Sequence, residues 1–203
     1  MNLTSEKING LQEVINIGVG EGAGVLNEML DTHINLQIPF IKIFDNDIAK
    51  KELKQSLGEG EFSAVELQFY GSLNGNSQIV FPKESAANLV AIITDEEEEN
   101  DDYDLDFLKR GALTEIGNIV ISGVMGAISN LLSQDLEYLL PSYLEGDVCH
   151  LLNKKNMADE STLILAQTHF YLEETAIQGD ILLIFNLASF NTILSVLKKL
   201  QQE

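Results

Sequence analysis

The chain of 203 residues has one cysteine, no tryptophan, three histidines and three prolines. A single cysteine cannot form an internal disulfide, so this cysteine usage is typical of a reducing compartment, and we expect a cytoplasmic protein. Cys149 stands beside His150, a pair that could suggest a nucleophile or a metal ligand. With no second cysteine and only two other histidines, we interpret Cys149 as an ordinary buried thiol.

Basic residues are also scarce, with 12 Lys and Arg against 32 Asp and Glu, and the net charge is −20. A chain this acidic would repel a nucleic-acid backbone, so nucleic acid is not expected as a partner. No apolar run approaches the 18 or so residues of a membrane span, and the first residues lack a basic and then apolar signal peptide. We therefore expect no membrane insertion.

Many of the acidic residues cluster in one run, from Asp95 to Asp106. An acidic run can indicate a calcium site, but this one lacks the glycine and the closing glutamate of an EF-hand loop. The run is therefore interpreted as a solvated linker over residues 95–104.

One sequence pattern occurs twice, at an offset of 102 residues. Each copy is a Glu-x-x-Asn pair, followed after 22 residues by a proline. The aligned residues are Glu13 with Glu115, Asn16 with Asn118, and Pro39 with Pro141. Such a pattern is hard to obtain twice by chance, so it indicates an internal duplication.

Residues 5–30 and 105–132 are predicted to be the two helices that carry these pairs. Apolar residues recur in both at intervals of three and four, which gives each helix one packing stripe. These stripes consist of Ile8, Leu11, Ile15, Val19, Gly22, Leu26 and Met29, and of Leu113, Ile116, Val120, Val124, Ala127 and Leu131. A second stripe consists of Asn9, Glu13, Asn16 and Gly20 in one helix, and of Glu115, Asn118 and Ser122 in the other. Because residues three apart are neighbours on a helix, the Glu and the Asn of each pair should lie side by side on an exposed face.

Glycines interrupt the first helix at positions 18, 20, 22 and 24, at a cost of about 1 kcal/mol each relative to alanine. One explanation is a dinucleotide-binding loop, since Gly18-x-Gly20-x-x-Ala23 approximates the Rossmann fingerprint. The second copy, however, keeps the Glu, the Asn and the Pro and loses most of the glycines. Close approach of a neighbouring helix or a partner is therefore the favoured explanation.

The rest of each half follows the same order of predicted elements. The first half has strand-like alternation from Ile34 to Ile43, with a change of phase just past Pro39 that indicates a bulge or bend on an edge strand. The first half continues with a helical tendency at 46–60, a hairpin of strands 62–70 and 77–81, and a helix at 85–94. The second half has predicted strands at 162–171 and 179–186 and a helix at 188–200. We predict an α/β (α+β) fold with pseudo-twofold duplication, a mostly antiparallel central sheet and both motif helices on one face. The chain is predicted to be one domain of two repeats, about 5–94 and 105–200.

The Glu-x-x-Asn pair has a plain interpretation and a functional one. A Glu and an Asn on an exposed helix face are usually only solvated, but asparagine is a mediocre helix former, so its recurrence in mid-helix calls for a use. A carboxamide donates and accepts hydrogen bonds without charge, and can hold a water in a chosen direction, as phosphoryl transfer requires. The helices lack any Ser–His arrangement, P-loop or metal cluster of their own, so they would have to complete an active site on another protein.

Two such motifs in about 200 residues resemble the CheC proteins of the CheC/CheX/FliY phosphatase family of bacterial and archaeal chemotaxis. The resemblance implies dephosphorylation of the response regulator CheY, with Asn16 and Asn118 orienting the attacking water and Glu13 and Glu115 engaging a lysine of the regulator. It implies no cofactor of the chain's own, since the Mg²⁺ belongs to the regulator, and it adds CheD as a further partner.

Four residues before the Glu, the family usually has Asp or Ser, whereas this chain has Asn9 in the first copy and Gly111 in the second. The first site, which keeps a polar group there, is expected to contribute at least as much as the second. The alternative function is a non-catalytic docking protein, because the related flagellar switch proteins share the architecture and mainly bind partners. Retention of Glu and Asn in both halves favours the phosphatase.

Overall fold

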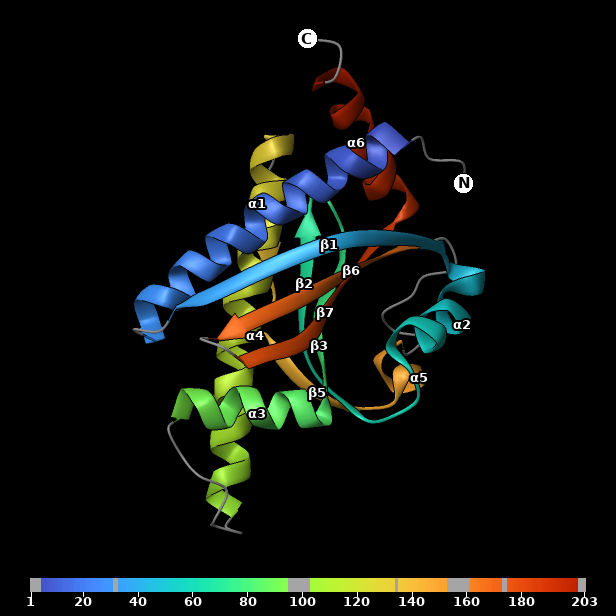
Figure 1. The fold of residues 1–203 in the computed structure, drawn as a ribbon. Helices are drawn as coiled ribbons and strands as arrows, with labels where there is room; N and C mark the ends of the chain where they lie inside the picture. Colours follow the sequence, from blue (N-terminus) through green and yellow to red (C-terminus); the bar gives the residue numbers. More distant parts are fainter. Residues whose placement is uncertain are drawn as a thin grey trace.

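A computed structural model describes residues 5–30, 33–94, 103–133, 135–152, 161–172 and 175–200. Its elements follow the order α1 (Ser5–Leu30), β1 (Ile34–Asp45), α2 (Asn46–Leu57), β2 (Phe62–Gly71), β3 (Gly75–Pro82), α3 (Lys83–Thr94), α4 (Tyr103–Leu132), β4 (Leu136–Tyr138), β5 (Ser142–Gly146), α5 (Val148–Leu151), β6 (Ser161–Leu172), β7 (Thr175–Asn186) and α6 (Leu187–Leu200). The helix, strand and turn order of the first half therefore repeats in the second, with one strand of the first half replaced by the pair β4 and β5 (Figure 1).

Seven strands form one sheet in the order β1-β6-β7-β3-β2-β4, with β5 also paired to β2. All the described pairs are antiparallel. The central pair β3 and β7 places Ile79 opposite Ile181. These two residues are 102 positions apart, which is the offset of the repeat, so a pseudo-twofold axis passes between them. The predicted fold class, including the duplication, is confirmed.

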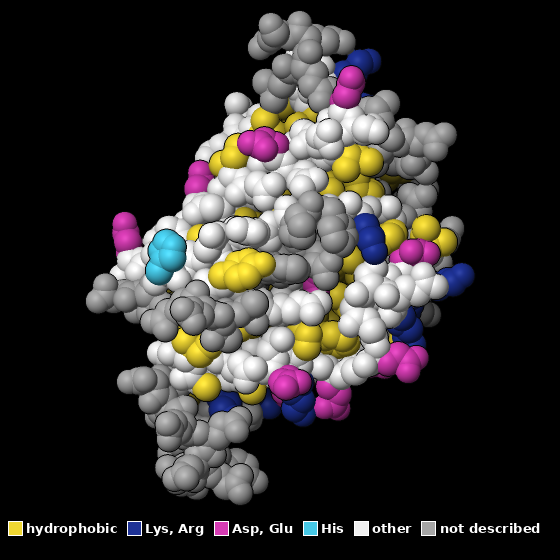
Figure 2. Space-filling model, in the orientation of Figure 1, with side chains coloured by type: hydrophobic (Ala, Val, Ile, Leu, Met, Phe, Trp, Pro, Cys, Tyr) yellow, Lys and Arg dark blue, Asp and Glu magenta, His cyan; other side chains and the backbone are white. Residues whose placement is uncertain are grey.

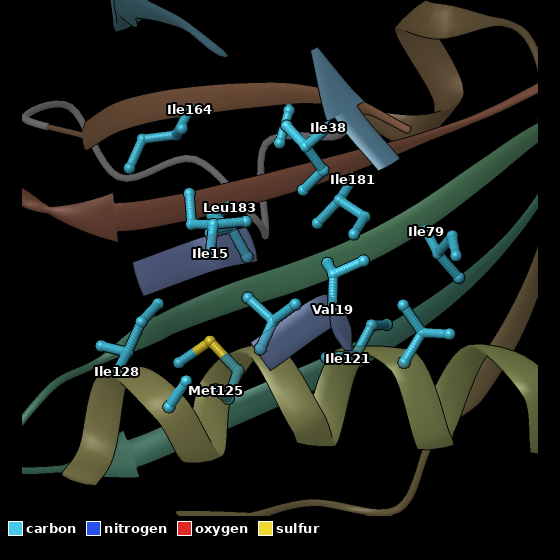
Figure 3. Packing of buried hydrophobic residues seen from close by; sticks show 14 of the residues in the cluster. Ile15, Val19, Ile38, Ile79, Ile121, Met125, Ile128, Ile164, Ile181 and Leu183 are labelled. Atoms are coloured by element: carbon cyan, nitrogen blue, oxygen red, sulfur yellow. The ribbon is translucent and has the colours of Figure 1, made fainter. Parts of the chain in front are cut away.

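Hydrophobic residues cover both faces of this sheet. The larger cluster lies between one face and the helices α1, α3, α4 and α6, and Figure 3 shows Ile15 and Val19 of α1 and Ile121 and Met125 of α4 meeting the sheet. A smaller cluster lies on the other face, under α2 and α5. Alternation of side chains along each strand supplies both clusters, as it does between Ile79 and Val80. Both motif helices therefore lie on the same face, as predicted.

The two edges of the sheet each contain a motif proline. In β1 the register with β6 shifts between Gln37 and Phe40, so the predicted bulge is confirmed, although it lies at Ile38 and Pro39 and not just past the proline. At the equivalent place in the second half, Pro141 separates β4 from β5. Proline lacks an N–H group for the ladder, which explains why both edge strands are interrupted where it occurs.

Three predictions differ from the structure. Cys149 is exposed, because Val148 and Leu151 are the buried residues of the single turn α5 and the residues between them point outward. Met29 of the predicted packing stripe is 48% exposed, and Leu26 is the last buried residue of α1 among those whose side chains are described. The helix α4 begins at Tyr103, so the last residues of the predicted linker are helical, while residues 95–102 lie outside the described part of the chain.

The structure also contains β4, β5 and α5, which periodicity alone did not indicate. Their strands are only three and five residues long, too short for a clear alternation. The repeat could have predicted these segments, because β4, β5 and α5 lie 102 residues after β1 and α2.

One helical segment, Phe107–Leu132 of α4, is long and apolar enough to cross a membrane by composition alone. Half of its most apolar window is buried inside the fold, against α1 and the sheet. Its place in the core of the fold accounts for its hydropathy.

Candidate functional site

The motif side chains lie on the outward surface of α1 and α4. Glu13 and Glu115 are exposed, and Asn16 and Asn118 are partly buried. The packing stripe beneath them is buried, with Leu11, Ile15, Val19, Val120 and Val124 all between 0% and 1% exposed. Each helix thus has one face against the core and another that presents the Glu and the Asn.

The two helices touch through glycine. A Cβ atom added at Gly18 would collide with the backbone of Gly123 and Val124, and one added at Gly22 would lie 3.1 Å from the Cα of Val120. These contacts account for Gly18 and Gly22, and they confirm close approach of a helix in place of a nucleotide loop. Gly20 and Gly24, in contrast, have open space on the helix surface.

The contact register shows that the two sites are separate. Gly18 meets Val124 and Gly22 meets Val120, so the helices cross in an antiparallel sense. Asn16 precedes Gly18 by two residues and therefore points about 160° away from the side that touches α4. The same holds for Asn118 and Val120 on α4. The structure therefore places the two Asn side chains on opposite flanks of the helix pair.

The spacing of 22 residues between Asn and Pro has a geometric reason. From Asn16, α1 runs about 21 Å to its end at Leu30, and β1 returns about 17 Å from Ile34 to Pro39. The chain thus comes back beside the part of α1 that carries Glu13 and Asn16. There the Nε2 of Gln12 donates a hydrogen bond of 3.3 Å to the carbonyl of Ile38 in β1. Because Gln12 and Asn16 are four apart, they share a flank, and the proline bulge lies on the flank of Asn16.

The second motif helix is attached to its edge strand by a different contact. Arg110 of α4 forms an ion pair of 3.5 Å with Glu145 of β5, and its guanidinium lies 5.3 Å from the ring centre of Tyr143. The hydroxyl of Thr114, at the position equivalent to Gln12, bonds within its own helix to the carbonyl of Arg110. Pro141, between β4 and β5, is partly buried.

The two asparagines differ in their hydrogen bonds. The hydroxyl of Ser122 donates to the Oδ1 of Asn118 over 3.4 Å. The equivalent of Ser122 in the first copy is Gly20, and Asn16 has no side-chain hydrogen bond to any described residue. One turn before the Glu, Asn9 is exposed, and Gly111 is exposed with open space around it.

The described residues contain no group of three or more His, Cys, Asp or Glu that could hold a metal ion. One small hollow, lined by Lys54, Gly58, Glu59, Gly60, Asp147 and Val148, lies at the ends of α2 and α5 and not at the motif. The motif surface offers a carboxylate and a carboxamide per copy. The carboxamide can bind and orient a water molecule, but it is neither a nucleophile nor a useful general base.

Two contacts of the site were missed from the sequence, those of Gln12 and Arg110. A signal for Gln12 existed, because it is four residues before Asn16 and therefore on the same flank. Arg110 had no such signal, since its partners Tyr143 and Glu145 belong to a strand that the sequence did not indicate.

No family model matches the sequence. Among curated proteins, the chain is 26% identical over 142 residues to the CheY-P phosphatase CheC of Bacillus subtilis (strain 168). The match covers 68% of this chain and 66% of that relative, a little less than two thirds of its length.

Solved structures match the fold over nearly the whole chain. Thermotoga maritima FliY has a TM-score of 0.76 with 18% identity, over 98% of this chain and 99% of that one. The FliM middle domain from H. pylori has a TM-score of 0.64 with 12% identity, over 96% and 99% of the two chains. CheX in the CheX–CheY–BeF₃–Mg²⁺ complex from Borrelia burgdorferi has a TM-score of 0.53 with 19% identity, over 86% and 99%. The chain is thus similar to the CheC/CheX/FliY proteins in its duplicated Glu-x-x-Asn helices, in its sequence match to CheC and in its fold.

Proposed function

We propose that this protein dephosphorylates the aspartyl-phosphate of a CheY-like response regulator in chemotaxis signalling. The observation that carries the proposal is the duplicated pair, Glu13 with Asn16 and Glu115 with Asn118, presented at equivalent places on two helices. The curated relative is named a CheY-P phosphatase, and one structural neighbour is a complex with CheY and Mg²⁺. Both names support the same substrate.

In the proposed reaction, each Asn inserts towards the phosphoryl group of a docked regulator. The carboxamide Oδ1 accepts a hydrogen bond from a water molecule, so that a lone pair of the water is directed at phosphorus. The Glu pairs with a lysine of the regulator and sets its register. The protein brings no metal, and the Mg²⁺ that neutralises the phosphoryl charge belongs to the regulator.

The direct test is the decay of a phosphorylated, Mg²⁺-loaded CheY-like domain with and without the protein. We expect faster decay with the wild type and no acceleration with the Asn16→Ala/Asn118→Ala double variant. A generic phosphate ester without the regulator serves as the control substrate and should be hydrolysed poorly. A double variant with full activity would contradict the role of both asparagines, and strong activity on the ester would contradict a shared active site.

A non-catalytic docking protein is the second candidate, and the fold shared with the FliM middle domain is compatible with it. Binding of the regulator without any change in its phosphate lifetime would support this candidate. The proposal places the protein in the cytoplasm, where CheY-like regulators act, and a CheD-like protein is a further partner to be tested by direct binding.

A further inference from the structure

We propose that Ser122 is a positioning residue, which holds the carboxamide of Asn118 in the orientation that water activation requires and has no counterpart at the first site. This inference rests on the proposed phosphatase function and describes how its two sites differ. The relevant contact is the hydrogen bond of 3.4 Å from the Ser122 hydroxyl to the Oδ1 of Asn118.

The geometry favours this role because Ser122 is one helical turn beyond Asn118 on the same exposed stripe. A bond to Oδ1 restricts rotation of the carboxamide about its last side-chain torsion, which is otherwise broad. The oxygen keeps a second lone pair that can accept from water, and the Nδ2 remains free to donate to a phosphoryl oxygen. The bond is long for an O–H···O contact, so we expect a modest effect.

At the first site the equivalent position is Gly20, which has no side chain, and Asn16 has no described hydrogen-bond partner. A Cβ at Gly20 would meet nothing within 4 Å, so a serine fits there. The difference between Ser122 and Gly20 favours the second site, whereas the difference between Asn9 and Gly111 favours the first. The polar Asn9 favours seating of the regulator at the first site, and Ser122 favours turnover at the second.

The experiment uses the full chain with one site active at a time. In the Asn16→Ala background, Ser122→Ala should lower kcat by about two- to fivefold with KM unchanged, and Ser122→Thr, which keeps the hydroxyl, should restore it. In the Asn118→Ala background, Gly20→Ser should raise kcat by a similar factor over Gly20→Ala. The alanine is the matched control, because it adds the same Cβ without a hydroxyl.

An activity-independent measurement accompanies the kinetics. Side-chain ¹⁵N relaxation should show a more ordered carboxamide at Asn118 than at Asn16, and Ser122→Ala should remove the difference. Equal order at both asparagines, an unchanged kcat in Ser122→Ala, or equal gains from Gly20→Ser and Gly20→Ala would each overturn the inference. If the wild type does not accelerate phosphate loss, the proposed function fails instead, and the positioning role in catalysis fails with it.

Discussion

Each motif asparagine occupies the middle of a long helix, a position where alanine would be the better helix former. The side chains are partly buried and lie apart from the packing stripes beneath them. Only the Asn118 side chain has a described hydrogen bond, and it is long. At the residue scale, the asparagines are therefore expected to contribute little to the stability of the fold.

Replacement of either residue, Asn16→Ala or Asn118→Ala, should change the free energy of unfolding by no more than about 0.5 kcal/mol. The phosphatase rate, in contrast, should fall with each substitution and vanish with both. Thermal unfolding beside the phosphate-decay assay measures the two effects on the same preparations. A fall of many degrees in Tm would show that the asparagines are structural.

A second residue-scale feature is the buried carboxyl of Asp180 on β7, which is 2% exposed. Burial raises its pKa from the ordinary 3.8 to about 7, and Gln178 and Lys42 oppose the shift only in part. At an offset of 102, its equivalent in β3 is the neutral and fully buried Gln78. A neutral side chain thus fits this environment.

The raised pKa has a defined effect on stability. Between about pH 4 and pH 7 the folded state keeps a proton that the unfolded state has lost, so this group lowers the free energy of unfolding as pH rises through that window. Asp180→Asn should match the wild type near pH 4 and exceed it by on the order of 2–4 kcal/mol at pH 8. Urea unfolding across this range measures the difference, and a constant difference would contradict a protonated Asp180.

At the scale of elements, the crossing of α1 and α4 determines how the motif surface is presented. The crossing depends on the absence of side chains at Gly18, Gly22 and Gly123, where each helix meets the backbone of the other. Backbone cannot rotate away as a side chain can, so any added atom must separate the helices.

Two substitutions in α1 test this arrangement. Gly18→Ala should destabilise the protein by about 1–3 kcal/mol, because its methyl group would collide with Val124 and lie 2.6 Å from the carbonyl oxygen of Gly123. Gly20→Ala, two residues away in open space, should instead stabilise it by up to about 1 kcal/mol. Midpoints of urea unfolding compare the two. Equal effects would show that helix propensity, and not the crossing, determines the cost.

At the scale of the whole molecule, the net charge of −20 is the dominant feature. Among the described residues, Figure 2 shows acidic side chains spread over the visible face. Such a distribution repels itself in the compact state, and the repulsion is screened by salt.

Raising NaCl from about 10 mM to about 150 mM shortens the Debye length from about 30 Å to about 8 Å. We expect Tm to rise by at least about 2–4 °C, as a gain of about 1 kcal/mol would produce in a chain of this size. A variant with Gln at positions 96–99 loses four of the negative charges and should show a smaller increase. A Tm independent of salt in the wild type would contradict charge repulsion as a determinant of stability.

The local pattern of the sequence was sufficient for the motif faces and for all the elements except β4, β5 and α5. The helix predicted over residues 5–30 is α1, and the strands and helices of both halves follow the predicted order, because the spacing of apolar residues reflects which side of each element is buried. The repeat at an offset of 102 was sufficient for the pseudo-twofold axis at Ile79 and Ile181. The motif pairs on the exposed face follow from the same periodicity.

Contacts between distant residues were decided only by the tertiary structure. No local pattern indicates that β1 pairs with β6 of the other half, that Arg110 meets β5, or that Gly18 meets α4 and Gly20 does not. The same applies to Cys149, whose exposure depends on which side of a single helical turn faces the sheet. Periodicity describes one element at a time, whereas these features depend on where two elements meet.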